Sequence, residues 1–120
     1  MLIKNTNAVP HFIAGDKTII RELLHPKNEA VDINYSVAHA SVLKGEASLP
    51  HKLNSSEVYY ILKGSGIVFI DDESKHVQKG DIVFIPPNAS QYIKNTGDGV
   101  LSFLCIVEPF WTPDAEYIND

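Results

Sequence analysis

The 120 residues have a mass of 13.3 kDa, with 44% hydrophobic and 21% charged side chains, which predicts one globular domain with its own core. Ten basic residues against fifteen acidic ones give a formal charge of −5, which argues against nucleic acid or an anionic membrane as a partner. The single cysteine, Cys105, excludes an internal disulfide framework, and the lack of a signal sequence or of an apolar run of about 20 residues predicts a cytoplasmic protein.

The first predicted element covers residues 16–24. Ile19, Ile20, Leu23 and Leu24 fall on one face if this stretch is drawn as a helix. The stretch is too short for periodicity to distinguish one or two helical turns from an additional strand. We favour a strand.

Short runs of apolar, β-branched and aromatic residues follow, separated at close intervals by glycine and proline, a pattern typical of an all-β protein. The predicted strands are residues 34–43, 47–53, 57–62, 66–70, 75–78, 81–85, 91–95 and 100–107. About eight strands are enough for a closed barrel or a two-sheet jelly roll. We therefore expect a barrel over residues 34–108, with residues 1–33 as an N-terminal extension packed on it and residues 109–120 as a C-terminal tail, all in one domain.

Two sequence blocks have a specific spacing, and fifteen residues separate them. The fixed positions of the two blocks are Gly45, His51, Leu53, Glu57 and Gly64, then Gly80, Pro86, Asn88, Gln91 and Asn95. This two-block pattern resembles the signature of the cupin superfamily. The resemblance implies an all-β double-stranded β-helix, or jelly-roll barrel, with one metal ion held inside by three histidines and a glutamate.

The chain departs from that signature at the metal-ligand positions. His51 and Glu57 are retained, but Leu53 replaces the second histidine of the first block and Gln91 replaces the histidine of the second. Asn88 stands where the signature has a glycine, a replacement that a left-handed backbone tolerates. The fold pattern is therefore intact, whereas half of the four metal ligands are changed.

Strand alternation points His51, Glu57 and Gln91 inward, so these three residues are the predicted ligands of a degenerate divalent-metal site. Imidazole, carboxylate and amide oxygen can all bind such an ion, the amide most weakly, and manganese, iron, nickel and zinc are the candidate ions. The alternative is a vacant polar pocket in which Glu57 and Gln91 hydrogen-bond to each other or to His51. A buried Glu57 with neither a metal nor a cationic partner would have a raised pKa.

Tyr59 and Glu57 are the catalytic candidates, Tyr59 as a substrate hydrogen-bond donor or general acid. The favoured interpretation of Tyr59 is nevertheless a core tyrosine whose hydroxyl bonds to a backbone carbonyl. His39 is expected to point outward at a subunit interface. The other histidines, all expected in solvent, are His11, His25 and His76.

Two functional hypotheses remain. Apolar walls with a few polar groups at one end of a barrel are typical of small-molecule sites. The first hypothesis is a binding module for a small ligand, and the second is a metal-dependent isomerase, dioxygenase or decarboxylase acting on a small sugar, organic acid or aromatic. Because oxygenase chemistry on iron usually needs more imidazole ligands than this chain keeps, we favour the binding module.

The chain is also predicted to form a homodimer. Tyr35, Val37 and His39 lie on the face of the first barrel strand opposite its small inward residues, and a monomer would leave that face partly apolar and wet. Phe110 and Trp111 in the tail also need an apolar surface, either in their own barrel or on a partner. Exposed apolar surface of this kind marks association sites, and two-fold pairing is the commonest arrangement.

Overall fold

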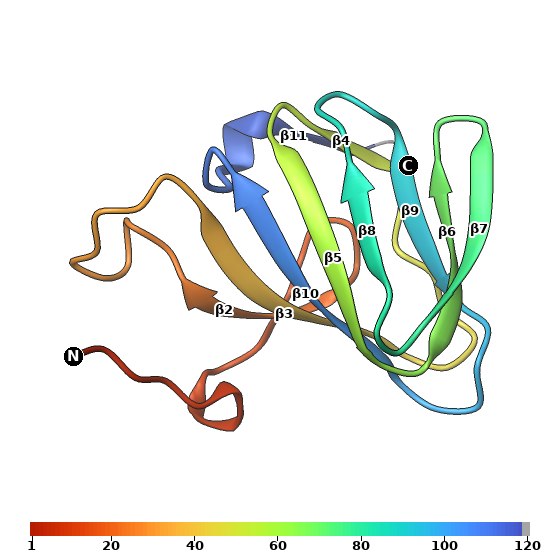
Figure 1. Cartoon of the computed structure of the whole chain (residues 1–120), viewed down its shortest axis with the longest axis horizontal. Helices are drawn as coiled ribbons and strands as arrows, with labels where there is room; N and C mark the ends of the chain where they lie inside the picture. Colours follow the sequence, from red (N-terminus) through yellow and green to blue (C-terminus); the bar gives the residue numbers. More distant parts are fainter. Residues whose placement is uncertain (119–120) are drawn as a thin grey trace.

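The computed structural model describes residues 1–118, which are almost entirely strands and the turns between them (Figure 1). The elements in chain order are the 3₁₀ helix η1 (Thr6–Ala8), β1 (Phe12–Ile13), β2 (Ile19–Leu24), β3 (Ser36–Val42), β4 (His51–Leu53), β5 (Ser56–Lys63), β6 (Ser65–Ile70), β7 (Glu73–Gln78), β8 (Ile82–Ile85), β9 (Gln91–Asn95), β10 (Leu101–Glu108), the 3₁₀ helix η2 (Pro113–Ala115) and β11 (Glu116–Ile118). Over these residues, no helix is long and apolar enough to cross a membrane.

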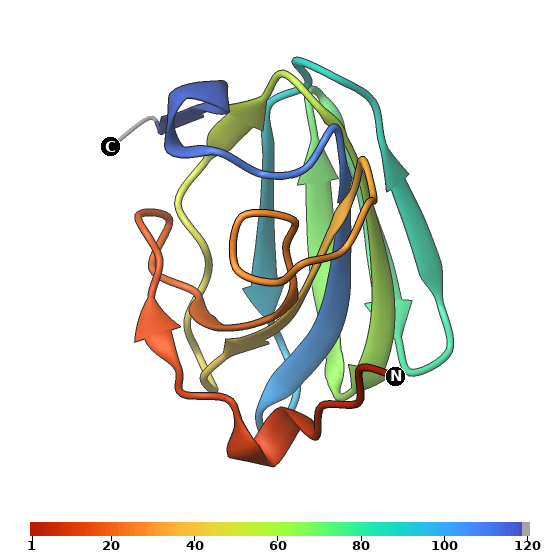
Figure 2. The ribbon, with the colours of Figure 1, turned by 90° about the vertical axis from the view of Figure 1, so that its left-hand side faces the viewer.

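The strands form two antiparallel sheets that face each other (Figures 1 and 2). The first sheet has the order β1-β2-β3-β10-β5-β8, and the second has the order β11-β4-β9-β6-β7. Strands that are neighbours in space, such as β3 and β10, lie far apart in the sequence, which is how a jelly roll is wound. The predicted all-β jelly-roll barrel is therefore confirmed.

Residues 16–24 contain a strand rather than a helix. β2 covers Ile19–Leu24 and pairs with β1 on one side and β3 on the other. The backbone N–H and C=O groups of β2 therefore find their hydrogen-bond partners on neighbouring strands. A helix would have to find these partners within its own short segment. The favoured strand prediction is correct, and the apparent helical face of this segment does not correspond to a helix.

The strand predicted at residues 47–53 is shorter in the structure, where β4 covers only His51–Leu53. Pro50 has no N–H to donate to a sheet. The N–H of Leu49 donates instead to the carbonyl of Asp16, at 2.8 Å, in the turn between β1 and β2. The chain therefore leaves the sheet to contact that turn before β4 begins.

The inner face of β3 determines where the barrel is filled and where it is hollow. At one end of the strand, Val42 pairs with Leu101, and neither is more than 4% exposed. Toward the other end, β3 contributes only the small residues Ser36, Ala38 and Ala40 to the inner face. The buried core comprises Ala40, Val42, Tyr59, Ile61, Val68, Val77, Ile85, Ala89, Ile93, Leu101, Phe103 and Cys105. Because small side chains leave space that the facing sheet does not fill, the end near Ser36 stays hollow.

The residues that follow β10 fold back over this hollow end (Figure 2). The N–H of Trp111 donates to the hydroxyl of Ser36 at 2.9 Å, and β11 then pairs with β4, so that Ile118 lies opposite His51. A Cβ added to Gly15, in the turn between β1 and β2, would lie 2.6 Å from Cδ1 of Ile118, so the glycine allows this turn to approach β11 closely. The turn and the tail thus meet across the open end of the barrel.

His25 is buried, so the expectation that it lies in solvent is wrong. It is 5% exposed, and its Nδ1 accepts a hydrogen bond from the N–H of Lys27 at 3.1 Å. Its Nε2 therefore carries the proton that is donated to the carbonyl of Trp111 at 2.7 Å. The ring also meets Phe110 edge-on, with ring centroids 5.2 Å apart. Phe110 and Trp111 of the tail thus find contacts within their own chain.

Candidate functional site

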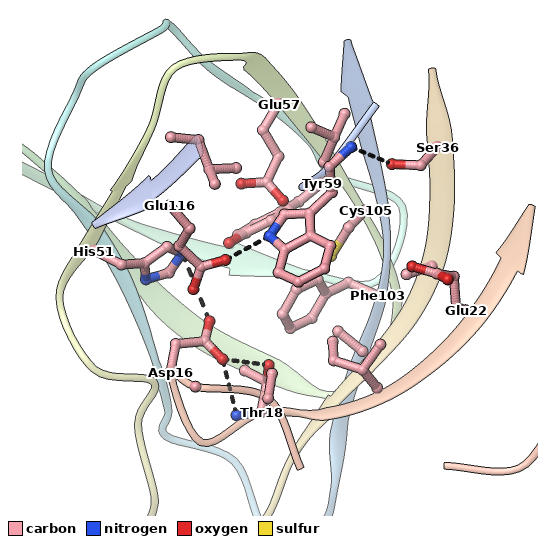
Figure 3. Close-up of a pocket in the computed structure, with 18 of the residues that line it drawn as sticks. Asp16, Thr18, Glu22, Ser36, His51, Glu57, Tyr59, Phe103, Cys105 and Glu116 are labelled. Carbon is pink, nitrogen blue, oxygen red and sulfur yellow. Dashed lines mark hydrogen bonds and ion pairs between the residues drawn. The ribbon is translucent and has the colours of Figure 1, made fainter. Parts of the chain in front are cut away.

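A cavity of about 190 Å³ occupies the hollow end of the barrel (Figure 3). Its walls come from the first two strands and their turn, from the inner faces of β3, β4, β5 and β10, and from the tail. The lining residues are Phe12, Ile13, Ala14, Gly15, Asp16, Thr18, Ile20, Glu22, Ser36, Ala38, Ala40, His51, Leu53, Glu57, Tyr59, Phe103, Cys105, Val107, Trp111 and Glu116. Apolar walls with a few ionisable groups are the usual composition of a small-molecule site.

His51 is fixed in the cavity wall by its backbone neighbours. It lies on β4 and is 3% exposed, and its Nδ1 is 2.7 Å from the carbonyl of Leu49. Because a carbonyl only accepts, Nδ1 carries a proton, and Nε2 is the ring atom that faces the other ionisable groups. This Nε2 lies 3.6 Å from Oδ2 of Asp16, so the two residues form an ion pair when His51 is protonated (Figure 3).

Glu57 is the most strongly perturbed acid of the site. It lies on β5 and is 6% exposed. The pKa of its carboxyl is raised to about 8, chiefly by burial and also by the negative charges of Asp16 and Glu116, while a hydrogen bond from Gln91 acts in the opposite direction. Glu57 is therefore mostly protonated at neutral pH in the unliganded protein.

Gln91 links Glu57 to Tyr59 behind the cavity wall. Its Nε2 donates to Oε1 of Glu57 at 2.9 Å, and its Oε1 accepts from the hydroxyl of Tyr59 at 2.7 Å. Gln91 is 1% exposed and does not line the cavity, although it pairs with His51 across β4 and β9. The Tyr59 ring packs against Phe103 with centroids 4.5 Å apart, and burial, with the nearby Glu57, raises the pKa of its hydroxyl well above the usual range.

These residues do not fit the metal cage that the family resemblance implies. Leu53 has no ligand atom, and the one oxygen of the Gln91 amide already accepts from Tyr59. Of the three predicted ligands, His51 and Glu57 line the cavity, and Gln91 lies behind Glu57. Within residues 1–118, no three His, Cys, Asp or Glu side chains are grouped so that they could hold a metal ion.

Asp16 belongs to the site although it lies outside both sequence blocks. Its Oδ1 accepts from the N–H of Thr18 at 3.1 Å and from the Thr18 hydroxyl at 2.6 Å, which fixes the carboxyl in the turn between β1 and β2. Lys17, between them, has a φ of 75°, as tight turns require. The local signal was therefore an Asp-x-Thr turn, but nothing in the sequence indicated that this turn reaches the barrel interior.

Two further acids and a tryptophan complete the wall. The indole Nε1 of Trp111 donates to Oε2 of Glu116 at 2.5 Å, and Glu22 accepts from the side-chain amide of Asn28. Together with Asp16 and Glu57, they give the cavity four carboxyl groups, and none of the residues that line it is Lys or Arg. The site is thus acidic, with His51 as its one basic side chain.

Comparison with known proteins assigns the fold to one family and leaves the function open. Residues 38–107 match the family model described as "Cupin domain". An uncharacterised protein of Methanocaldococcus jannaschii is 43% identical over 110 residues, covering 90% of this chain and 87% of that protein. A protein of Thermotoga maritima named "oxalate-binding protein" is 35% identical over 51 residues, covering 42% of each chain.

Solved structures give the same fold. A predicted oxalate decarboxylase from Thermotoga maritima superposes with a TM-score of 0.79 at 21% identity, covering 90% of this chain and 99% of that one. The polyketide cyclase RemF from Streptomyces resistomycificus superposes with a TM-score of 0.78 at 18% identity, covering 96% and 89% of the two chains. At these identities the similarity is one of fold.

Proposed function

Because the chain belongs to the cupin family, we propose that it binds a small molecule inside its barrel. The observation that carries the proposal is the cavity of about 190 Å³, in which apolar walls surround ionisable groups from several elements. An engineered cavity of about 150 Å³ accepts benzene, so this one has room for a somewhat larger molecule. Small side chains leave this buried volume unfilled, and a small-molecule site needs such a volume.

The alternative, a metal-dependent enzyme, has less support. Similar structures include a predicted oxalate decarboxylase, but that activity is the property of the other protein. In this chain the oxygen of Gln91 is held by Tyr59, and the position of a second imidazole is occupied by Leu53. A divalent ion would thus find His51 and Glu57 as its only ligands from the predicted set, fewer than the three protein ligands of a typical catalytic zinc site.

Ligand binding can be tested with benzene-sized probes that are neutral, cationic or anionic. Trp111 is the only tryptophan and lines the cavity, so its fluorescence reports on the site. We expect binding of at least one probe at millimolar or lower concentration, weakened about tenfold or more by Ala38→Leu, which fills the cavity. Ser41→Leu, which places the same side chain on the outer face of β3, should leave binding unchanged. If no probe binds, or if both variants bind like the wild type, the proposal is wrong.

Metal content provides the matching test of the alternative. The protein is purified without chelator and without nickel affinity chromatography, and its metals are measured by plasma mass spectrometry. The binding proposal predicts much less than one ion per chain. A stoichiometric transition metal would instead favour the metal-dependent enzyme.

We also propose that two copies associate through the outer face of the first sheet. Val37 and His39 of β3 continue there into a row of apolar side chains on three neighbouring strands. The exposed members of this face include Tyr60 (42%), Ile82 (71%), Phe84 (62%) and Ile106 (38%). A flat apolar face can pair with itself about a two-fold axis, so a second copy is the partner we propose.

The homodimer is tested by light scattering coupled to size exclusion. We expect twice the mass of 13.3 kDa for the wild type, and a monomer for Phe84→Asp, which places a charge in the middle of the apolar face. Glu73→Lys, on the exposed hairpin of the other sheet, is the control. A wild-type mass of 13.3 kDa at micromolar concentration would refute the dimer.

A cytoplasmic location remains part of the proposal, since the one thiol, Cys105, is free and buried.

A further inference from the structure

We propose that the cavity selects a small organic cation, namely a protonated amine on an apolar body about the size of benzene. This inference rests on the proposed small-molecule function and adds the chemical class of the ligand. It is based on three carboxyl groups that come from three different elements. One oxygen of each group accepts a hydrogen bond from the protein, and the other oxygen faces the cavity.

The three carboxyl groups are those of Asp16, Glu57 and Glu116. Asp16 is held through Oδ1 by Thr18, Glu57 through Oε1 by Gln91, and Glu116 through Oε2 by Trp111. Each side chain is thus fixed in direction by the protein before a ligand arrives. Figure 3 shows the three carboxyl groups directed toward the same space.

The second oxygens have no hydrogen-bond partner within residues 1–118. Oδ2 of Asp16 has only the long contact of 3.6 Å to His51. The clearest case is Glu57, because its side chain is 6% exposed and its Oε2 faces the cavity without accepting a hydrogen bond. Because the pKa of Glu57 is raised to about 8, this carboxyl is mostly protonated in the unliganded protein, and a cationic donor beside its Oε2 would favour its ionised form.

A protonated amine supplies what these oxygens lack. It carries three N–H donors and one positive charge, and the wall offers three carboxyl oxygens and no Lys or Arg. The one basic side chain, His51, already faces Asp16. An anion such as a carboxylate would instead be repelled by the negative charges of Asp16 and Glu116, and it would bring no donor for their oxygens.

The rest of the cavity suits an apolar body rather than a bare metal ion. Leu53, Phe103 and Val107 line the same cavity as the acidic groups, and no cluster of metal-ligating side chains forms among the described residues. Hard cations need about six or more oxygen ligands close together. A molecule with one ammonium group and a compact hydrocarbon part meets both the acids and the apolar wall.

The experiment compares three probes of one shape, namely benzylamine, benzyl alcohol and benzoate, by Trp111 fluorescence and calorimetry at neutral pH and constant ionic strength. We expect benzylamine to bind about tenfold or more tighter than benzyl alcohol, and benzoate to bind weakest. Asp16→Asn keeps the acceptor for Thr18 and should lower benzylamine affinity about tenfold, with benzyl alcohol changed less than about twofold. Glu73→Gln changes the net charge equally, on an exposed hairpin, and should change neither.

The outcomes separate this inference from the proposed function. If benzyl alcohol or benzoate binds as tightly as benzylamine and Ala38→Leu weakens it, small-molecule binding stands and the cationic class is wrong. If none of the three probes binds the wild type, the inference is wrong, and the broader probe set decides the proposed function. If Mn²⁺ displaces benzylamine and binds more tightly, the acids form a metal site and the inference is again wrong. The comparison of probes on the wild type does not depend on the stability of any variant.

Discussion

The two ends of the barrel are made from the same strands and differ in almost every physical respect. At the packed end, Ile61, Ile93 and Leu101 are at most 1% exposed and belong to the hydrophobic core. At the hollow end, the same sheets carry a cavity and carboxyl groups with unused oxygens. This difference indicates that the packed end stabilises the fold. That stability allows the hollow end to retain polar groups whose burial is unfavourable for folding.

The largest effect that would test this comparison concerns Glu57. The carboxyl faces Asp16 from the β1–β2 turn, His51 from β4, Cys105 from β10 and Glu116 from β11. Its folded pKa of about 8 lies above the ordinary value of 4.5, so the folded state holds the proton more tightly. The resulting stability is complete below pH 4.5 and is lost as the pH rises toward 8, by about 1.4 kcal/mol per pH unit.

Glu57→Gln removes that titration while keeping the size of the side chain. Compared with the wild type, the free energy of unfolding of the variant should rise by about 3 kcal/mol between pH 5 and pH 8, measured by urea denaturation. The exposed Glu73→Gln is the matched control, and its difference from the wild type should stay constant. Parallel pH curves for Glu57→Gln and the wild type would show that the hollow end does not hold a protonated acid.

A deletion at the packed end should have a similar cost at every pH. Ile93→Ala removes a fully buried side chain between the sheets and should lower the free energy of unfolding by about 3 kcal/mol. Ala38→Gly, at the hollow end, removes one methyl group beside an existing cavity and should cost about 1 kcal/mol. Chemical denaturation measures both, and equal losses would contradict a division of labour between the ends.

Restoring the family ligands is expected to change the hollow end without affecting the packed end. Leu53 and Gln91 are both buried beside His51, so Leu53→His with Gln91→His would bring three imidazoles and Glu57 together. Affinity for Ni²⁺ or Zn²⁺ should rise about a hundredfold or more, because each imidazole adds a coordinate bond. Calorimetric titration of both proteins measures the change. Equal affinities would mean that the strands do not place these positions around one point.

The smallest effect is expected at Asn88, in the turn before β9. Its φ is 68°, a conformation that glycine adopts freely and asparagine tolerates. Asn88→Gly should change the free energy of unfolding by less than about 0.5 kcal/mol, whereas Asn88→Ala should cost about 1 kcal/mol. A larger loss in the glycine variant than in the alanine variant would show that the asparagine side chain itself stabilises the turn.

The barrel could be predicted because its signals are local. The alternation around Glu57 and the glycines and prolines between strands depend on residues a few positions apart, and so does the inward direction of Gln91. The shortening of β4 could not be predicted, because it results from the bond between Leu49 and Asp16, which are distant in the sequence. The positive φ at Asn88, by contrast, agrees with its place in the second block.

Two of the acids of the site were missed for the same reason. Asp16 and Glu116 lie outside the two blocks, and each looks like an ordinary surface acid in its local sequence. Only the pairing of β11 with β4, and the contact of Gly15 with Ile118, bring these segments to the barrel opening. Pair contacts across about a hundred residues leave no periodic pattern that a single sequence reveals.

The contact between the β1–β2 turn and β11 has an evolutionary consequence. Since the segments that flank the barrel supply Asp16, Trp111 and Glu116, substitutions in those segments alter the groups that line the cavity while the packed end of the barrel keeps its composition. Changes in these short peripheral stretches can therefore alter the cavity wall with no need to redesign the strands that fold the domain. In this architecture, the flanking segments can vary one part of the cavity wall while the barrel strands keep both the fold and the other part, including His51 and Glu57.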